Sequence, residues 1–224
     1  MDSELDVLER GALAFCLAAR LTAWPDDETL REAKVLAEGL EDGGSPERAL
    51  ISIAAHAERA RYEPEYLTLF ENGPRRCPVH ETEYGRMRGM AKGNELADIA
   101  GFYTAFGMTR ADGDAARQLS DHLAVELEFY GTLLAKQAAL LEAGDGEGGS
   151  IVLDARRKFL GDHLGRLTNA ISSQPSVQGS PVYGPLLAST HALVQAECNA
   201  LSVTPAPMDF LPEQAESEVM CCAT

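Results

Sequence analysis

Aromatic residues, basic residues and long apolar runs are all scarce in this sequence. Aromatic side chains make up 6% of the 224 residues, and 19 Lys and Arg stand against 35 Asp and Glu, a formal charge of −16. Nucleic-acid binding needs clustered cations, so this balance argues against nucleic acid and favours a basic partner. No apolar stretch is long enough to span a bilayer, and the N-terminus has no basic region before an apolar run. We therefore expect a cytoplasmic protein without stable membrane insertion.

Cysteine is present in an odd number and without paired spacing, which argues against a disulfide framework. Cys16 and Cys198 lie in helical patterns, Cys77 lies in a predicted loop, and Cys221 and Cys222 lie near the C-terminus. An unpaired set of this kind indicates a reducing compartment.

Signatures of metal and nucleophile chemistry are also missing. No histidine follows a glutamate by three residues, as in di-iron carboxylate bundles, and there is no P-loop, G-x-S-x-G elbow or G-x-G-x-x-G. Cys77, His80 and Glu81 lie close together but lack the second ligand pair of a zinc site. We predict no metal site, no cofactor and no enzymatic activity.

Helical periodicity runs through most of the chain, and no period-two strand pattern of useful length occurs. We predict an all-α fold, with a single globular helical domain of about nine helices over residues 1–203 and a Pro-rich acidic C-terminal tail over residues 204–224. GDGEGG, at 144–149, is predicted to be a flexible linker. The predicted helices cover about residues 5–23, 26–41, 45–57, 65–70, 81–90, 94–107, 119–141, 151–172 and 182–203.

The stretch from Asn94 to Leu141 places acidic, imidazole and aromatic groups beside a strong core stripe. The stripe recurs at helical intervals, and a second row lies at its edge. The stripe comprises Leu119, Leu123, Leu127, Tyr130, Leu134 and Leu141, and the second row comprises His122, Glu126, Phe129 and Leu133. We expect this helix to bury its leucines and to present a mixed acidic and aromatic edge to an adjoining groove.

His122 and Glu126 allow two interpretations because they lie one helical turn apart. They form either an ion pair on the helix surface or part of a ligand-binding site. An alternative function is a small helical metal-binding protein or enzyme that uses this pair with Cys77 and His80. His163 and His191 are expected to be histidines at the edge of the core.

Several motifs, in order and spacing, resemble the TorD/DmsD/NarJ family of dedicated cytoplasmic chaperones for molybdopterin-containing oxidoreductases. The likeness extends from about Tyr62 to Leu201. ELADIAGFYTAFGM and DHLAVELEF look closest to the branch that serves the dimethyl sulfoxide reductase superfamily, including nitrate-reductase-like enzymes. The motifs are YLTLF at 66–70, Pro78 followed by Glu81 and Tyr84, Asp121-His122 followed by Glu126-Leu127, Phe159 with His163-Leu164, and Tyr183 with Leu186-Leu187.

The resemblance implies an all-helical chaperone, monomeric or a domain-swapped homodimer. It would bind the twin-arginine leader and the apo catalytic subunit of a molybdopterin oxidoreductase until cofactor insertion and export. The leader-binding surface maps onto Tyr66, Leu69, Phe70, Asp121, His122 and Glu126.

The chemistry of these residues suits a twin-arginine leader, which joins two guanidinium groups to an apolar segment. Carboxylates pair well with Arg, and an apolar groove between helices accepts an amphipathic peptide. Asp121 and Glu126, beside Tyr66, Phe70 and Phe129, would supply both features. We expect Asp121 to lie near the surface, and Leu69 to be mostly buried because YLTLF has the spacing of a core segment.

Overall fold

The computed structural model describes residues 3–40, 44–72, 77–84, 92–108 and 120–208. The all-α prediction is confirmed: these residues form nine helical stretches and no strand. The elements are α1 (Glu4–Thr22), α2 (Asp27–Glu38), α3 (Ser45–Ala55), α4 (Arg59–Tyr66) with the π-helix η1 (Leu67–Glu71), the 3-10 turn η2 (Glu81–Glu83), α5 (Lys92–Ala105), α6 (Leu123–Glu142), α7 (Gly146–Phe159) continuing through the π-helix η4 (Leu160–Leu164) into α8 (Gly165–Ser172), α9 (Pro175–Gln178) and α10 (Tyr183–Ala200).

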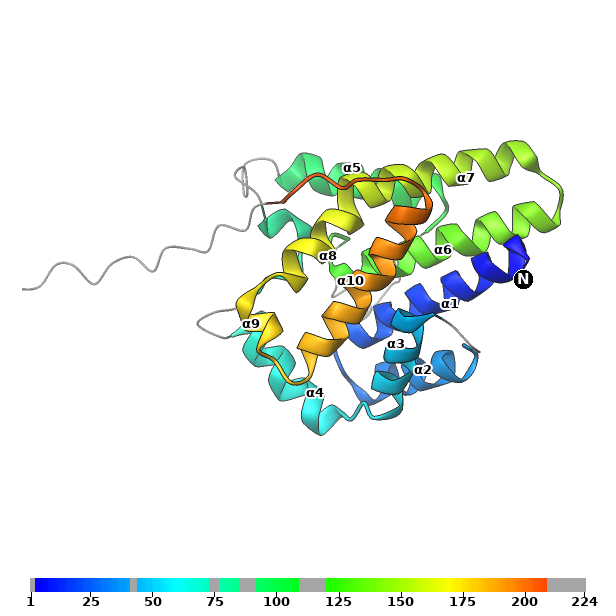
Figure 1. Ribbon diagram of the computed structural model, residues 1–224. Helices are drawn as coiled ribbons and strands as arrows, with labels where there is room; N and C mark the ends of the chain where they lie inside the picture. Colours follow the sequence, from blue (N-terminus) through cyan, green and yellow to red (C-terminus); the bar gives the residue numbers. More distant parts are fainter. Residues whose placement is uncertain (1–2, 41–43, 73–76, 85–91, 109–119, 209–224) are drawn as a thin grey trace, which may run out of the picture.

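The centre of the molecule is the pair α1 and α6, which lie side by side (Figure 1). A Cβ atom on Gly131 of α6 would lie 3.1 Å from the carbonyl oxygen of Ala12 on α1, so glycine permits this close approach. Beside it, the rings of Phe15 and Tyr130 pack with centroids 4.6 Å apart. Helices α2 and α3 flank α1 on one side, α7 flanks α6, and α10 packs on α8 and α3.

The core stripe predicted for α6 is largely confirmed. Leu123, Leu127, Tyr130 and Leu134 are all buried. Leu141 is 43% exposed, so the prediction was wrong there, because it lies in the last turn of α6. Leu119 lies outside the described residues.

Helix α6 begins later than the sequence suggested. His122 has an extended backbone (φ −77°, ψ 135°), and its side chain accepts a hydrogen bond from the backbone amide of Ala124. It is therefore the N-cap residue, and Asp121 precedes the helix. Asp121 lies in a turn and His122 in an isolated bridge, so neither residue lies on a helix face.

Three other predictions of local structure need correction. GDGEGG is not a flexible linker, because α7 begins at Gly146, with Asp145 capping it by accepting from the Gly148 amide. The helix predicted at 65–70 does not begin there, because α4 starts at Arg59, contains Pro64 and continues directly into η1. Within 81–90, the described residues form only the turn η2, and residues 85–90 lie outside the described part.

The chain after α10 packs back on the π-helix η4. A Cβ atom on Gly165 would lie 2.5 Å from Cγ of Pro205, and one on Gly161 would lie 3.5 Å from Cγ1 of Val203. The first residues of the predicted tail therefore contact the domain. The predicted division at residue 203 stays a prediction, and Cys221 and Cys222 lie outside the described residues.

None of the helices in the described part of the chain is both long and apolar enough to cross a bilayer.

Candidate functional site

A short backbone pairing brings the loop 77–84 against the start of α6. The Glu81 amide donates to the Asp121 carbonyl oxygen at 2.9 Å, and the Leu123 amide donates to the Val79 carbonyl oxygen at 2.9 Å. His80 and His122 thus form an isolated antiparallel bridge. This pairing joins two of the motifs that carry the family resemblance.

Asp121 lies beneath this loop and is completely buried, so the expectation of a surface position was wrong. Its Oδ2 accepts from the Thr82 hydroxyl at 2.6 Å and from the Thr82 amide at 3.2 Å, and its Oδ1 lies 3.3 Å from His80 Nδ1. Burial alone would raise the pKa of Asp121, but the hydrogen bonds from His80 and Thr82 hold it at about 2. Asp121 is therefore a buried carboxylate whose charge is satisfied by internal donors.

His122 connects the loop to the YLTLF segment. Its Nδ1 accepts from the Ala124 amide at 3.0 Å, and its Nε2 lies 3.2 Å from the Tyr66 hydroxyl. Because Nδ1 is an acceptor, we assign the neutral tautomer in which Nε2–H donates to Tyr66. Burial and the neighbouring His80 lower the pKa of His122 to about 3, which agrees with a neutral ring. A surface ion pair with Glu126 was therefore a wrong interpretation.

Glu126, one turn into α6, is completely buried, and neither carboxyl oxygen has a hydrogen-bond partner among the described residues when the group is ionised. Burial raises the pKa of Glu126 well above its ordinary value, and the charges of Glu81 and Asp121 raise it further. A protonated Glu126 can donate to Glu81. Burial therefore favours the protonated form of Glu126.

His163 completes the polar cluster from the opposite side. Its Nδ1 lies 2.9 Å from Oε2 of Glu81, and its Nε2 lies 3.3 Å from Oδ2 of Asp98 on α5. Burial opposes charge on His163, but the hydrogen bond with Glu81 and the charges of Glu81, Asp98 and Asp162 raise its pKa. His163 was expected to lie at the edge of the core, but its ion pair with Glu81 was not predicted. Glu81 was noted in the family motif and beside Cys77 and His80, but it was not predicted as a site residue.

Two π-helices lie at the family motifs. The run Leu67–Glu71 forms η1 directly after Tyr66, and the run Leu160–Leu164 forms η4, which carries His163. A π-helix widens the turn and shifts the side chains that follow, and such turns are frequent at functional sites. Helical periodicity alone gives no signal for them.

The aromatic residues of the predicted site lie in two groups. Tyr66 and Phe70 stack edge-to-face with each other and with Tyr183, at centroid distances of 5.0, 6.0 and 4.9 Å. Phe129 packs against Tyr103 and Phe159 at 4.6 and 4.8 Å. Leu69 is 7% exposed, which confirms its predicted burial.

The predicted site residues are thus gathered around one end of α6, but each of them is buried. Asp121, His122 and Glu126 share the polar cluster, and Tyr66 reaches it through its hydroxyl. The apolar members, Leu69, Phe70 and Phe129, are packed in the core rather than displayed in a groove.

The residues of the alternative metal site are not arranged to bind a metal ion. The Cys77 thiol lies 3.4 Å from the Tyr84 hydroxyl, and burial raises its pKa to about 11, which disfavours the thiolate that metals bind. Both ring nitrogens of His122 already have partners. Among the described residues, no three His, Cys, Asp or Glu side chains are grouped so as to hold a metal ion.

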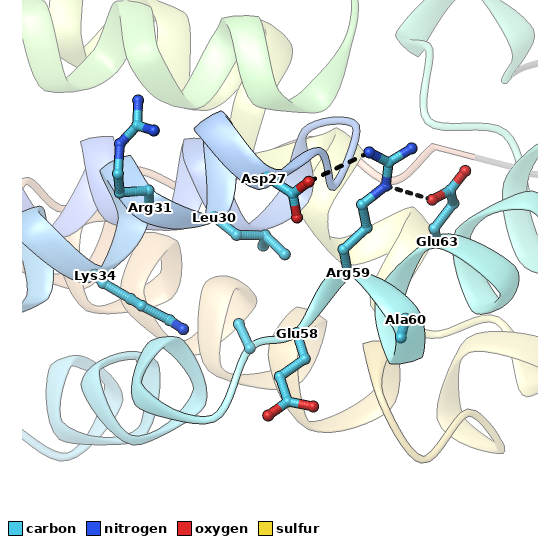
Figure 2. A pocket seen from close by; sticks show the side chains of 9 residues that line it. Asp27, Leu30, Arg31, Lys34, Glu58, Arg59, Ala60 and Glu63 are labelled. Atoms are coloured by element: carbon cyan, nitrogen blue, oxygen red, sulfur yellow. Dashed lines mark hydrogen bonds and ion pairs between the residues drawn. The ribbon is translucent and has the colours of Figure 1, made fainter.

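A groove of about 660 Å³ lies elsewhere, between α2 and the start of α4 (Figure 2). Arg59 bridges its two sides, with contacts of 3.5 Å to Asp27 and 2.6 Å to Glu63. Leu30 and Ala57 contribute apolar surface to its lining, and Lys34 adds a positive charge. None of the predicted site residues lines this groove.

One family of known proteins matches the chain. The family described as "Nitrate reductase delta subunit" matches residues 27–168, which is more than half of the chain. The matched region includes α2 to α7, the loop 77–84, η4 and all the residues of the polar cluster. No curated protein matches the sequence.

Proposed function

The chain belongs to the nitrate reductase delta subunit family, a family of chaperones for molybdoenzyme maturation, and we propose that it binds the twin-arginine leader of its client enzyme. The family consists of chaperones and not of catalysts, so the chain is not an enzyme. The proposed client is the apo catalytic subunit of a cytoplasmically folded molybdopterin oxidoreductase of the dimethyl sulfoxide reductase superfamily. The chaperone holds this subunit until its cofactor is inserted and export can begin.

The contact between Tyr66 and His122 carries this proposal. The two residues are 56 positions apart in the sequence, yet the hydroxyl and Nε2 lie 3.2 Å from each other. The contact joins the two motifs that the family resemblance assigns to leader binding. Through His122 it links the aromatic group of Tyr66 and Phe70 to the segment that carries Asp121, which supports a site that accepts a basic and an apolar ligand feature at neighbouring positions.

Leader binding requires the loop 77–84 to shift, because Asp121 is fully buried beneath it. In the free chain, Thr82 and His80 satisfy the Asp121 carboxylate. A guanidinium can replace these donors, since its N–H groups match a carboxylate in a bidentate arrangement. The internal hydrogen bonds thus keep the site neutralised until the leader arrives.

Calorimetric titration with a synthetic peptide tests this function. The probe carries two adjacent arginines followed by an apolar run of leucine and alanine, and its matched control carries two lysines instead. We expect saturable binding of the arginine peptide, weakening by roughly tenfold or more for the lysine peptide, because lysine is a point charge without the planar fork. Added salt should weaken the binding of the basic peptide. Equal binding of both peptides, or no binding of either, would contradict the proposal.

A further inference from the structure

His163 lies between two carboxylates that come from different segments of the chain. Its Nδ1 lies 2.9 Å from Oε2 of Glu81 in the loop 77–84, and its Nε2 lies 3.3 Å from Oδ2 of Asp98 on α5. A neutral imidazole carries one N–H, so either neutral form would turn a lone pair toward a carboxylate. The geometry therefore favours a ring that is protonated on both nitrogens.

The two contacts of His163 differ in kind, but both depend on its charge. The contact with Glu81 is a hydrogen bond that a charged ring strengthens. The contact with Asp98 is an ion pair without hydrogen-bond geometry, because Nε2 has no hydrogen-bond partner among the described residues. Loss of one proton would therefore weaken the contact with Glu81 and remove the attraction of Asp98.

Burial makes this loss unfavourable for Glu81. The side chains of His163 and Glu81 are 6% and 5% exposed, whereas that of Asp98 is 55% exposed. A buried carboxylate whose charged partner becomes neutral is strongly destabilised, so Glu81 would move toward solvent. Asp98 already contacts water and needs no such movement.

A movement of Glu81 acts directly on the pairing between the loop 77–84 and α6. The backbone amide of Glu81 donates to the Asp121 carbonyl oxygen at 2.9 Å. The next residue, Thr82, donates to Asp121 Oδ2 through its amide and its hydroxyl. The side chain and the backbone of the turn η2 are thus held by neighbouring groups, and a shift of one disturbs the other.

We propose that His163 is a proton-dependent latch: its doubly protonated ring fastens the loop 77–84 and α5 to η4, and its deprotonation releases the loop from the start of α6. His163 is a positioning residue in this inference, because it acts on the loop through Glu81.

The surroundings of His163 determine the direction of the pH dependence, and most of the groups around it are acidic. The charged and titratable groups are Glu81 on η2, Glu95 and Asp98 on α5, Glu126 on α6, Lys158 on α7, Asp162 on η4 itself and Arg166 on α8.

The carboxylates oppose the effect of burial on the ring. Burial lowers the pKa of His163, but the hydrogen bond with Glu81 and the charges of Glu81, Asp98 and Asp162 raise it above the ordinary value. Because the folded pKa is the higher one, the stabilisation by the latch is fully present below the ordinary pKa and is lost as pH rises through the folded pKa. The loop is therefore released on the alkaline side.

The state of the ring is measured by NMR of the full chain with 15N-labelled histidine, titrated from about pH 5 to about pH 9. The signals of His163 are identified by their absence in His163→Gln. We expect both ring nitrogens to be protonated at the acidic end and the pKa to lie above the ordinary value. Asp98→Asn should lower this pKa, and Asp154→Asn, at an exposed position on α7, should leave it unchanged. A neutral ring at about pH 6 would overturn the inference.

The release of the loop is measured by hydrogen exchange of two amides. The Glu81 and Leu123 amides close the backbone pairing, and the Asp145 amide, which donates to the Leu140 carbonyl oxygen beyond the other end of α6, serves as the reference. The ratio to the reference cancels the intrinsic rise of exchange with pH. We expect this ratio to increase roughly tenfold or more across the titration of His163, as for loss of a charged hydrogen bond.

His163→Gln separates the latch from a purely structural role of the ring. Glutamine carries an N–H donor but no charge, so the exchange ratio should be high already at acidic pH and should no longer change with pH. Asp98→Asn, a change at an exposed position, should shift the step in the exchange ratio to lower pH. An exchange ratio that is independent of pH in the wild type, or a step that persists in His163→Gln, would overturn the inference.

A consequence for the leader rests on the proposed function, because the leader reaches Asp121 only when the loop has moved. His163→Gln should bind the twin-arginine peptide roughly tenfold more tightly than the wild type at about pH 6, and both should bind it equally at about pH 9. Equal affinities at the acidic pH would contradict a role of the latch in leader binding. Failure of the peptide to bind either protein would contradict the proposed function alone, since the ring titration and the exchange rates need no peptide.

Discussion

His163 and Glu81 are 82 residues apart in the sequence, yet His163 Nδ1 lies 2.9 Å from Glu81 Oε2 in the interior of the molecule. The contact ties the π-helix η4 to the loop 77–84, which itself pairs with the start of α6. The ion pair and the backbone pairing therefore connect three segments that are remote in sequence, namely η4, the loop 77–84 and the start of α6. Beside it, the buried carboxylate of Asp121 accepts hydrogen bonds from Thr82 and lies 3.3 Å from His80 Nδ1.

Glu126→Gln should stabilise the fold near neutral pH. The pKa of Glu126 is raised in the folded chain, so above the ordinary carboxyl pKa the unfolded state loses a proton that the folded state keeps. Stability then falls as pH rises, by about 1.4 kcal/mol per pH unit until the folded pKa is reached. Glutamine does not ionise, so this loss of stability with rising pH is absent in the variant.

Urea unfolding at pH 4 and pH 7.5 checks the prediction for Glu126. The gain in unfolding free energy should be present at the higher pH and nearly absent at the lower one. Glu142→Gln, which changes an exposed residue, should leave both values unchanged. Destabilisation by Glu126→Gln at pH 7.5 would contradict the protonated state assigned to this carboxyl group.

Tyr66→Phe and Tyr183→Phe should have different effects, although the two rings are neighbours with centroids 6.0 Å apart. The Tyr66 hydroxyl contacts His122, and its loss leaves a buried Nε2–H without an acceptor. This should destabilise the fold by about 1–3 kcal/mol. The Tyr183 hydroxyl is buried without a partner among the described residues, so its removal should be neutral or stabilising. Thermal unfolding of both variants gives the comparison, and equal losses would contradict it.

The sequence predicted the helical fold because periodicity is a local property. The stripe Leu123, Leu127, Tyr130 and Leu134 repeats at helical intervals, and each member is buried. The helix predicted from residue 26 is also present as α2, and its N-cap Asp26 accepts from the Thr29 amide at 2.7 Å. Patterns of this kind involve only residues that are close together in the sequence.

The arrangement of the polar cluster could not be predicted from such patterns. Asp121 was expected at the surface because charged residues are rarely buried, yet its partners Thr82 and His80 lie 39 and 41 positions earlier. Glu81 and His163 are likewise brought together only by the loop pairing and the π-turn. The family resemblance picked out Asp121, His122 and Glu126, but it gave no sign that they are enclosed.

Asp121→Asn should destabilise the fold, because the carboxylate is buried with three internal contacts. Its folded pKa of about 2 lies below the ordinary value of 3.8, so its contribution is present above pH 4 and is lost as pH falls toward 2. We expect a loss of about 2 kcal/mol at pH 7 and little difference near pH 2.

Asp154→Asn is the control for Asp121→Asn. Asp154 is 79% exposed and pairs only at the surface with Arg157 at 3.3 Å, so its substitution should change stability by less than about 0.5 kcal/mol. Chemical unfolding as a function of pH compares the two variants. An unchanged stability of Asp121→Asn at pH 7 would show that the internal contacts contribute nothing.

Gly165→Ala should disturb the packing of the chain after α10. The added Cβ would overlap the Leu160 carbonyl oxygen and would lie 2.5 Å from Cγ of Pro205, so the π-turn or the following segment must move. Overpacking of this kind costs about 1–3 kcal/mol. Gly161→Ala meets only Val203 at 3.5 Å and should be tolerated. Thermal unfolding should separate the two variants, and equal tolerance would mean that residues 203–205 do not pack on η4.

The most direct test of the proposed chaperone role is capture of the client in the native host. The full chain, carrying an affinity tag, is purified from cells under conditions in which molybdenum cofactor synthesis is blocked, and the co-purifying proteins are identified by mass spectrometry. The account predicts the apo catalytic subunit of a molybdopterin oxidoreductase that still carries its twin-arginine leader, and loss of this subunit when the two leader arginines are changed to lysine. Absence of any such subunit, or capture that does not depend on the arginines, would contradict the account.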